Sequence, residues 1–181
     1  MSFFKKKKLQ RELFIDSIVS MISETGIQKI VNESVKLITD TTSITDADEI
    51  KEQLSFELLS VYLYGTVFTI EKYVTTKETS RNILDEVHHK ILRPFCENEQ
   101  DLINMMAECQ MRYLQYYQLF REKLAEKNLA GKIGTLLLKN ILPEQIVKEN
   151  YFAATALGGS FLIFLKNIDQ LLKETTSDYE L

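Results

Sequence analysis

The sequence contains little glycine, proline, cysteine or histidine and no tryptophan. Its 181 residues include six Gly, two Pro, two Cys and two His. So few glycines and prolines leave long stretches without a strong turn signal, and these stretches lack the strict alternation of apolar and polar side chains that is typical of strands. The absences therefore favour long helices, and a chain of this length can bury a substantial core without disulfides or a structural metal.

The net charge and the cysteines restrict the class of protein. A formal net charge of −4 argues against a general nucleic-acid binder, because most non-specific affinity for DNA or RNA comes from a basic face. Cys96 and Cys109 fit a reducing compartment in which both remain thiols. No sustained apolar signal-peptide region follows the first lysines. We therefore expect a cytoplasmic protein that does not bind nucleic acid.

Two apolar stretches need to be considered as membrane spans. A span requires ~20 predominantly apolar residues. Leu54–Ile70 carries Glu57 inside it, and Tyr151–Leu165 is too short before Lys166 interrupts it. We interpret both stretches as buried helices of a bundle.

The helical spacing of apolar residues predicts the fold. It predicts helices at about 4–24, 27–38, 45–74, 75–93, 98–127, 132–142 and 143–173. The expected fold class is all-α: a single-domain antiparallel helical bundle of about six or seven helices with long central helices. Residues 1–173 are expected to form this domain, and residues 174–181 an acidic tail that frays.

Short-range signals predict several helix ends. Gly26 is expected to end the first helix in a left-handed conformation, Pro94 to kink or end the fourth, and Pro143 to begin the last. Three residue pairs match a capping box or a variant of it and predict helix starts: Thr45 with Asp48, Thr75 with Glu78, and Asn98 with Asp101.

The last predicted helix carries a glycine in an apolar seam. Residues at intervals of four and three form this seam: Val147, Tyr151, Ala154, Gly158, Phe161, Leu165, Ile168 and Leu172. Because a glycine removes side-chain bulk, Gly158 predicts a close crossing with another helix. A similar seam over Ile50–Phe68 contains Gly65. We therefore expect these two helices to touch through Gly65 and Gly158.

Aromatic residues concentrate on the three long predicted helices. Together with small residues near Gly158, they could line a pocket for a small apolar ligand. The expected lining is Tyr62, Phe68, Tyr113, Tyr117, Tyr151, Gly158 and Phe161. The alternative is that aromatic and small side chains interlock and fill the core without a void.

Candidate catalytic and metal-binding residues are few. Glu86 and His89 have the i, i+3 spacing of di-iron bundles, but such a site needs the motif twice, and His88 is the only other histidine. Cys109 falls on an apolar helix face, where a cysteine usually serves as a small hydrophobe. The sequence has neither a GxSxG elbow nor a Walker loop. We predict no catalytic site, no metal and no cofactor; a single metal at His88 or His89 is the remaining alternative.

The N-terminal segment is the clearest basic run in the sequence. It consists of Phe3, Phe4, Lys5, Lys6, Lys7 and Lys8. It could be a solvated helix start, or its rings and charges could contact an anionic membrane surface. It could also dock on acidic residues of the same fold or of a second subunit.

These observations favour a non-enzymatic helical binding or interaction protein, of a regulatory or adaptor kind. The long seams offer more apolar surface than one bundle needs to bury, so a protein partner or self-association as a homodimer is expected. The alternative is a small-molecule sensor or carrier with an aromatic pocket between the long helices.

Overall fold

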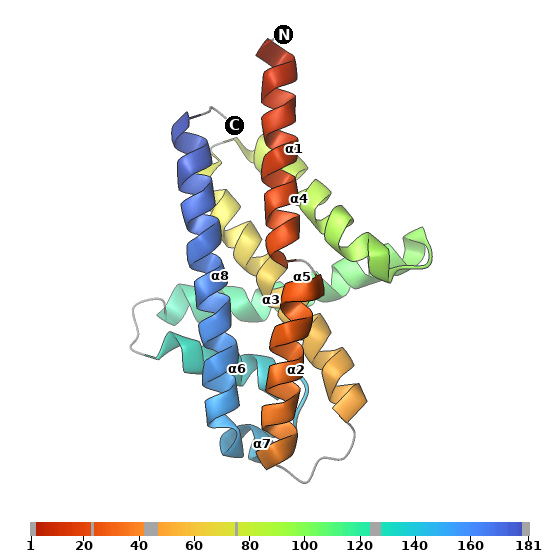
Figure 1. Ribbon diagram of the computed structural model, residues 1–181, viewed down its shortest axis with the longest axis vertical. Helices are drawn as coiled ribbons and strands as arrows, with labels where there is room; N and C mark the ends of the chain where they lie inside the picture. Colours follow the sequence, from red (N-terminus) through yellow and green to blue (C-terminus); the bar gives the residue numbers. More distant parts are fainter. Residues whose placement is uncertain (1–2, 23, 42–46, 75, 124–127, 179–181) are drawn as a thin grey trace.

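The computed structural model describes residues 3–22, 24–41, 47–74, 76–123 and 128–178. All regular secondary structure in these ranges is helical, which confirms the predicted all-α class. The elements are α1 (Phe3–Ile22), α2 (Glu24–Thr41), α3 (Ala47–Tyr73), α4 (Lys77–Leu92), the short 3-10 helix η1 (Arg93–Phe95), α5 (Glu99–Lys123), α6 (Leu129–Lys139), α7 (Glu144–Glu149) and α8 (Tyr151–Asp178). In Figure 1, α1 and α2 follow one another along the long axis, α8 runs beside them, and α5 lies across the back.

The middle of α3 is the centre of the core. Every residue from Glu57 to Thr66 is buried, because α2, α4, α5 and α8 all pack against this helix. A helix that is covered on all sides needs apolar side chains nearly all round, and the sequence from Leu58 to Leu63 supplies them. The apolar stretch is therefore explained by burial within the protein.

Two predicted helix ends are confirmed. α4 ends at Leu92, and Pro94 lies in η1, where the chain leaves the helix axis. The Asp101 backbone N–H donates to Asn98 Oδ1 at 3.0 Å, and the Asn98 N–H donates to Asp101 Oδ2 at 3.3 Å. This reciprocal pair satisfies two backbone donors at the start of α5, as the spacing of the two residues predicted.

The prediction for Gly26 was wrong. α2 begins at Glu24, so Gly26 lies in its first turn, and no glycine in the described ranges has a positive φ. Backbone N–H groups in a first helical turn have no intrahelical partner in any case. The break between α1 and α2 therefore falls before the glycine.

The last predicted helix is in fact two helices. α7 begins directly after Pro143, as predicted, but it ends at Glu149, and α8 begins at Tyr151. The Asn150 side chain donates to the Ile146 carbonyl oxygen at 2.9 Å. Local bonding of this kind competes with a continuous helix and favours a bend.

The remaining boundaries differ from prediction by a few residues. α6 begins at Leu129 rather than near Lys132. The N-cap of α4 is Thr76, whose hydroxyl donates to Thr79 Oγ1 at 2.7 Å instead of capping a backbone N–H. The predicted caps Thr45 and Thr75 lie outside the described residues.

The backbones of α6 and α8 are in contact where the two helices cross. A Cβ atom on Gly134 would lie 1.6 Å from the Ala154 carbonyl oxygen, and one on Gly158 would lie 1.8 Å from the Ala130 carbonyl oxygen. Ala130 and Gly134 are four positions apart on α6, and Ala154 and Gly158 are four positions apart on α8. One turn of each helix therefore presents only small residues to the other. The close crossing predicted at Gly158 is confirmed, and its partner is α6.

The predicted contact between Gly65 and Gly158 was wrong. A Cβ atom on Gly65 would lie 2.8 Å from side-chain atoms of Phe161 and of Leu165. α3 therefore meets α8 through these larger side chains, because the space at Gly158 is already occupied by α6. The seam spacing predicted that another helix comes close to each glycine, but it could not identify that helix.

One helix among the described residues is long and apolar enough to cross a membrane, judged by length and composition alone. It is the Tyr151–Thr175 part of α8. Core helices of soluble proteins pass the same test. In the structure, Ala154, Phe161 and Ile168 of this helix are buried against other helices.

Candidate binding groove

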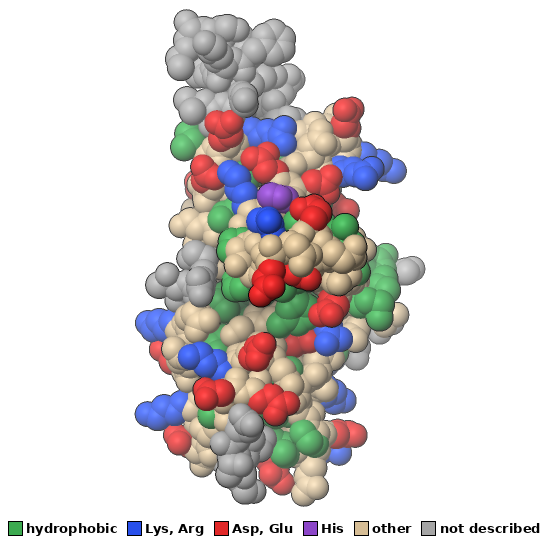
Figure 2. Space-filling model, turned by 90° about the vertical axis from the view of Figure 1, so that its right-hand side faces the viewer, with side chains coloured by type: hydrophobic (Ala, Val, Ile, Leu, Met, Phe, Trp, Pro, Cys, Tyr) green, Lys and Arg blue, Asp and Glu red, His purple; other side chains and the backbone are tan. Residues whose placement is uncertain are grey.

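A groove opens on the side of the molecule where α4 turns into α5. Its volume is about 1360 Å³. The walls come from the end of α1, the start of α2, the first half of α3, the end of α4 with η1, the first half of α5, and the residues after α6. Figure 2 looks onto this face, where hydrophobic side chains lie between acidic ones in a hollow near the middle of the molecule.

The floor of the groove is apolar. Its apolar side chains are Val19, Ile22, Ile27, Phe56, Leu59, Ile91, Phe95, Met105 and Ile141. Most of them are buried or partly buried, whereas the Phe95 ring is about half exposed. A partner that covers this floor would remove further apolar area from water, which is the main source of affinity in most protein complexes.

Acidic side chains outnumber basic ones around this floor. The acidic residues are Asp16, Asp48, Glu49, Glu52, Glu57 and Glu108, and the basic residues are Lys51, Lys90 and Arg112. Lys90 Nζ lies 2.8 Å from Asp16 Oδ1 and 3.7 Å from Glu86 Oε1, so its charge is already shared between two carboxylates. The rim therefore favours a cationic partner.

A buried carboxylate lies at the base of the groove. Glu57 is almost completely buried and accepts hydrogen bonds from Arg112 Nε at 2.5 Å, from Asn140 Nδ2 at 2.9 Å and from the Tyr116 hydroxyl at 3.3 Å. Burial, and next the charge of Glu57, raise the pKa of Tyr116 well above its usual value, so this hydroxyl remains a donor. These bonds tie α3 to α5 and to the chain after α6, and they hold the groove walls together.

Sequence reasoning did not single out Glu57, Arg112 or Asn140 as site residues. One signal was present: Glu57 interrupts an apolar stretch, and a carboxylate inside a buried helix needs a charged or hydrogen-bonding partner. The partners lie 55 and 83 positions away along the chain. No local spacing could have identified them.

The structure places the seven residues of the predicted aromatic pocket in three different environments: the core, partly buried positions beside it, and the surface. Tyr62 and Phe161 are buried in the core with ring centroids 5.9 Å apart in an edge-to-face arrangement. Tyr117 and Tyr151 are about half exposed, and Tyr151 contacts the Asn128 side chain through its hydroxyl. None of the seven residues lines the groove.

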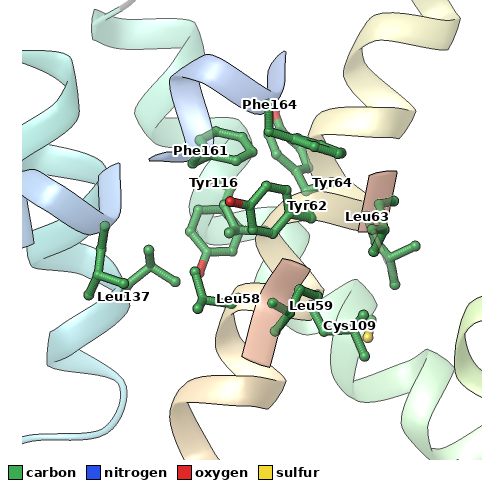
Figure 3. Close-up of a cluster of buried hydrophobic side chains, with 14 of the residues drawn as sticks. Leu58, Leu59, Tyr62, Leu63, Tyr64, Cys109, Tyr116, Leu137, Phe161 and Phe164 are labelled. Atoms are coloured by element: carbon green, nitrogen blue, oxygen red, sulfur yellow. The ribbon is translucent and has the colours of Figure 1, made fainter. Parts of the chain in front are cut away.

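Packed rings connect the other predicted pocket residues to the core. Phe68 and Tyr113 are partly buried, and each packs against Tyr64, with centroid distances of 6.4 and 5.8 Å. Phe120 then continues the cluster, 5.9 Å from Phe161. Figure 3 shows the buried rings of Tyr62, Tyr64, Tyr116, Phe161 and Phe164 gathered around α3. The centroid distances in the cluster are typical of direct aromatic packing. The backbone of Ala130 fills the space next to Gly158.

The two histidines have different environments. His89 is exposed, whereas His88 is buried between α4 and α5. His88 Nδ1 lies 2.6 Å from the Leu84 carbonyl oxygen, which can only accept, so Nδ1 carries the proton and Nε2 accepts from the Tyr113 hydroxyl at 2.6 Å. Burial lowers the pKa of His88. The arrangement holds a neutral imidazole as a structural link between the two helices.

Neither the metal alternative nor the basic N-terminal segment gains a defined site. In the described part of the chain, no group of three or more His, Cys, Asp or Glu side chains is placed to hold a metal ion. α1 begins at Phe3, but the side chains of residues 3–10, which include the predicted contact residues Phe3, Phe4, Lys5, Lys6, Lys7 and Lys8, lie outside the described part.

Comparison of the chain with protein-family models, curated proteins and solved structures finds no significant match.

Proposed function

We propose that this protein is a non-enzymatic helical binding protein whose groove holds an apolar, basic helical segment of a partner protein. The observation that carries the proposal is the continuous apolar floor of the groove between acidic edges. A binding surface of this kind suits an adaptor or regulatory role, because binding a partner segment requires no catalytic residues.

The size and shape of the groove favour a peptide segment over a small molecule. Small-molecule sites usually measure roughly 300–1,000 Å³ and bury most of their ligand. The groove is larger, at about 1360 Å³, and Figure 2 shows it as a hollow on the surface. Amphipathic helices bind in open apolar grooves by inserting side chains from one face, at i, i+3, i+4 and i+7.

The charges favour a partner with lysine or arginine beside its apolar residues. Asp48, Glu52 and Glu108 are exposed at the edges of the groove. Exposed ion pairs contribute only about 0–1 kcal/mol each, so the apolar floor would supply most of the affinity. The carboxylates would mainly accelerate association and discriminate against acidic segments.

A designed peptide can test this proposal without knowledge of the natural partner. The probe is a fluorescently labelled helical peptide with leucine on one face, at i, i+3, i+4 and i+7, and lysine at the remaining positions. Its matched control carries glutamate in place of every lysine. We expect saturable binding of the lysine peptide, measured by fluorescence anisotropy, and no binding of the glutamate peptide over the same concentration range.

Matched protein variants then locate the binding site. Phe95→Ser, and separately Glu52→Lys combined with Glu108→Lys, are expected to weaken binding at least about tenfold, which is about 1.4 kcal/mol. Phe152→Ser, and Glu78→Lys combined with Glu149→Lys, change exposed residues outside the groove in the same way and should leave binding unchanged. Equal effects of both sets would show that the peptide binds by general charge attraction, and the groove proposal would be rejected.

The alternative function is a carrier of a small apolar ligand, and the same variants separate it from the first. A neutral fluorescent dye such as Nile red reports an apolar site through its emission. Dye binding that Phe95→Ser abolishes, together with no binding of the lysine peptide, would replace the peptide proposal with a carrier function in the groove.

A further inference from the structure

α5 exposes a second apolar face that the groove does not use. Four large apolar side chains on this face are more than half exposed: Ile103 (53%), Met111 (67%), Leu114 (65%) and Tyr117 (52%). Ala107 is exposed between them. We refer to these five residues as the α5 stripe. Contiguous exposed apolar surface on one helix is typical of an interface with another molecule.

The helical geometry of α5 separates its core, groove and stripe faces. The side chains that point into the core are Leu102, Cys109, Tyr116 and Phe120. Met105, Glu108 and Arg112 line the groove. At 3.6 residues per turn, the α5 stripe occupies the part of the circumference that neither of these sets covers. In Figure 1, α5 lies across the back of the molecule, and hydrophobic side chains stand out at the edge of Figure 2 that corresponds to this side.

The spacing along the stripe is that of a helix–helix seam. Ile103, Ala107, Gln110, Leu114 and Tyr117 follow one another at intervals of four, three, four and three, which keeps one line of side chains facing a partner helix. Gln110 is exposed at the centre of the line. A single polar residue in such a seam commonly fixes register and partner number, because its amide can pair with the same amide of an identical helix.

We propose that the α5 stripe packs against the same stripe of a second copy of this chain, with the two helices antiparallel. A two-fold axis near Gln110 would place Ile103 of one copy opposite the Leu114–Tyr117 end of the other. The two copies would then bury both ends of the stripe in one self-complementary contact.

The helix dipoles favour the antiparallel orientation. An antiparallel pair places the positive end of each helix dipole beside the negative end of the other. A parallel pair would align like ends. Because the groove lies on another face of α5, dimerisation would leave it open.

Sedimentation equilibrium of the full chain tests the association. The wild-type protein should have the mass of a dimer at micromolar concentration, and Leu114→Glu and Ile103→Glu should each give a monomer. Ile163→Glu changes a similarly exposed apolar residue on α8 and should remain dimeric. Circular dichroism confirms that each variant is folded. A monomeric wild type, or a dimer that survives both stripe variants, would overturn the proposal.

Cysteine cross-linking tests the orientation. In a Cys96→Ser background, Gln110→Cys places a thiol near the two-fold axis, so a short bismaleimide should link two chains. Gln118→Cys is the matched control, because an antiparallel pair separates its two thiols by roughly 24 Å, at 1.5 Å per residue. Cross-linking at both positions would indicate a parallel pair and would contradict the antiparallel arrangement. Cross-linking at neither position would place the contact elsewhere.

Discussion

A Cβ atom on Gly158 would lie 1.8 Å from the carbonyl oxygen of Ala130. This is far inside van der Waals contact, and the obstacle is backbone rather than a side chain that can rotate away. The same crossing brings Gly134 against the Ala154 carbonyl oxygen at 1.6 Å. The absence of two Cβ atoms therefore sets how closely α6 and α8 can approach, and the position of α6 in turn fixes that of Asn140, a hydrogen-bond partner of Glu57.

Gly158→Ala should destabilise the protein strongly. Overpacking usually costs about 1–3 kcal/mol and occasionally more, and we expect at least the upper part of this range because α6 and α8 must move apart as whole helices. Urea denaturation followed by circular dichroism measures the loss in free energy of unfolding.

Gly159→Ala is the matched control, one residue further along the same helix. An added Cβ at Gly159 meets nothing within 4 Å. Because alanine favours a helix over glycine by about 1 kcal/mol, this variant should be as stable as wild type or more stable. Equal destabilisation by both variants would show that loss of flexibility in α8, rather than the crossing with α6, is the cause.

Local signals predicted features that depend on a few neighbouring residues. The Asn98 and Asp101 cap and the break at Pro94 follow from bonds and clashes within one turn of chain. Gly158 likewise indicated a close approach, but the sequence could not identify Ala130 as the partner, because both α3 and α6 present a small residue of their own. Which of the two reaches α8 depends on how the loops and the rest of the core pack.

The groove was not predictable from any single stretch. Its walls come from α1, α2, α3, α4, α5 and the chain after α6, and each contributes only a few side chains. The predicted aromatic pocket relied on rings that share helices but not a common face: Tyr116 is fully buried while its neighbour Tyr117 is half exposed. A one-residue step along a helix turns a side chain by about 100°, so composition alone could not distinguish the two.

The ion pair between Glu57 and Arg112 should respond asymmetrically to mutation. Arg112→Met leaves the Glu57 carboxylate buried without its cation, and breaking a buried pair in this way costs about 3–5 kcal/mol. Glu57→Gln leaves a neutral amide of the same shape, and the Arg112 side chain is 31% exposed and can turn toward water. We expect a loss of only about 1–3 kcal/mol for Glu57→Gln. Urea denaturation of both variants measures the difference.

A larger loss for Glu57→Gln than for Arg112→Met would contradict this interpretation. It would mean that the bonds from Asn140 and Tyr116 to Glu57 stabilise the fold more than the ion pair does. Asn140→Ala combined with each variant would then show which bond is responsible, through the coupling energy of a double-mutant cycle.

Protonation of His88 should destabilise the fold in mild acid. Burial lowers the pKa of His88 in the folded protein below its value of 6.5, so the unfolded chain binds a proton first as pH falls. The contribution of the neutral imidazole to the free energy of unfolding is fully present above pH 6.5. It is lost as the pH falls from 6.5 to the folded pKa, and the total loss is about 1.4 kcal/mol for each unit by which burial lowers the pKa. Below the folded pKa, the loss is complete and constant.

Two histidine variants isolate this effect. His88→Gln should remove the histidine contribution to the pH dependence of unfolding, measured by urea denaturation at several pH values. His89→Gln changes the neighbouring exposed histidine and should retain it. If His89→Gln flattens the pH dependence instead, the exposed ring and not the one bonded to Tyr113 is responsible.

The two cysteines should differ widely in reactivity. Burial raises the pKa of Cys109 to about 11, and its sulfur lies against Ser60 at 3.6 Å between α5 and α3. Cys96 is partly exposed. Because the thiolate is the reactive form, a disulfide reagent such as DTNB at pH 8 should label one thiol per folded chain rapidly and two per chain in denaturant. Cys96→Ser should abolish the rapid phase.

The slower labelling of Cys109 measures how readily the core opens. In Cys96→Ser, labelling of Cys109 requires α5 to separate from α3. The labelling rate should therefore rise with the destabilising variants Gly158→Ala and Arg112→Met, and it should stay the same or fall in Gly159→Ala. If Cys109 reacts as fast in wild type as an exposed thiol, α5 leaves the core readily without global unfolding. α5, which carries part of the groove wall and the α5 stripe, would then be a mobile element of the protein.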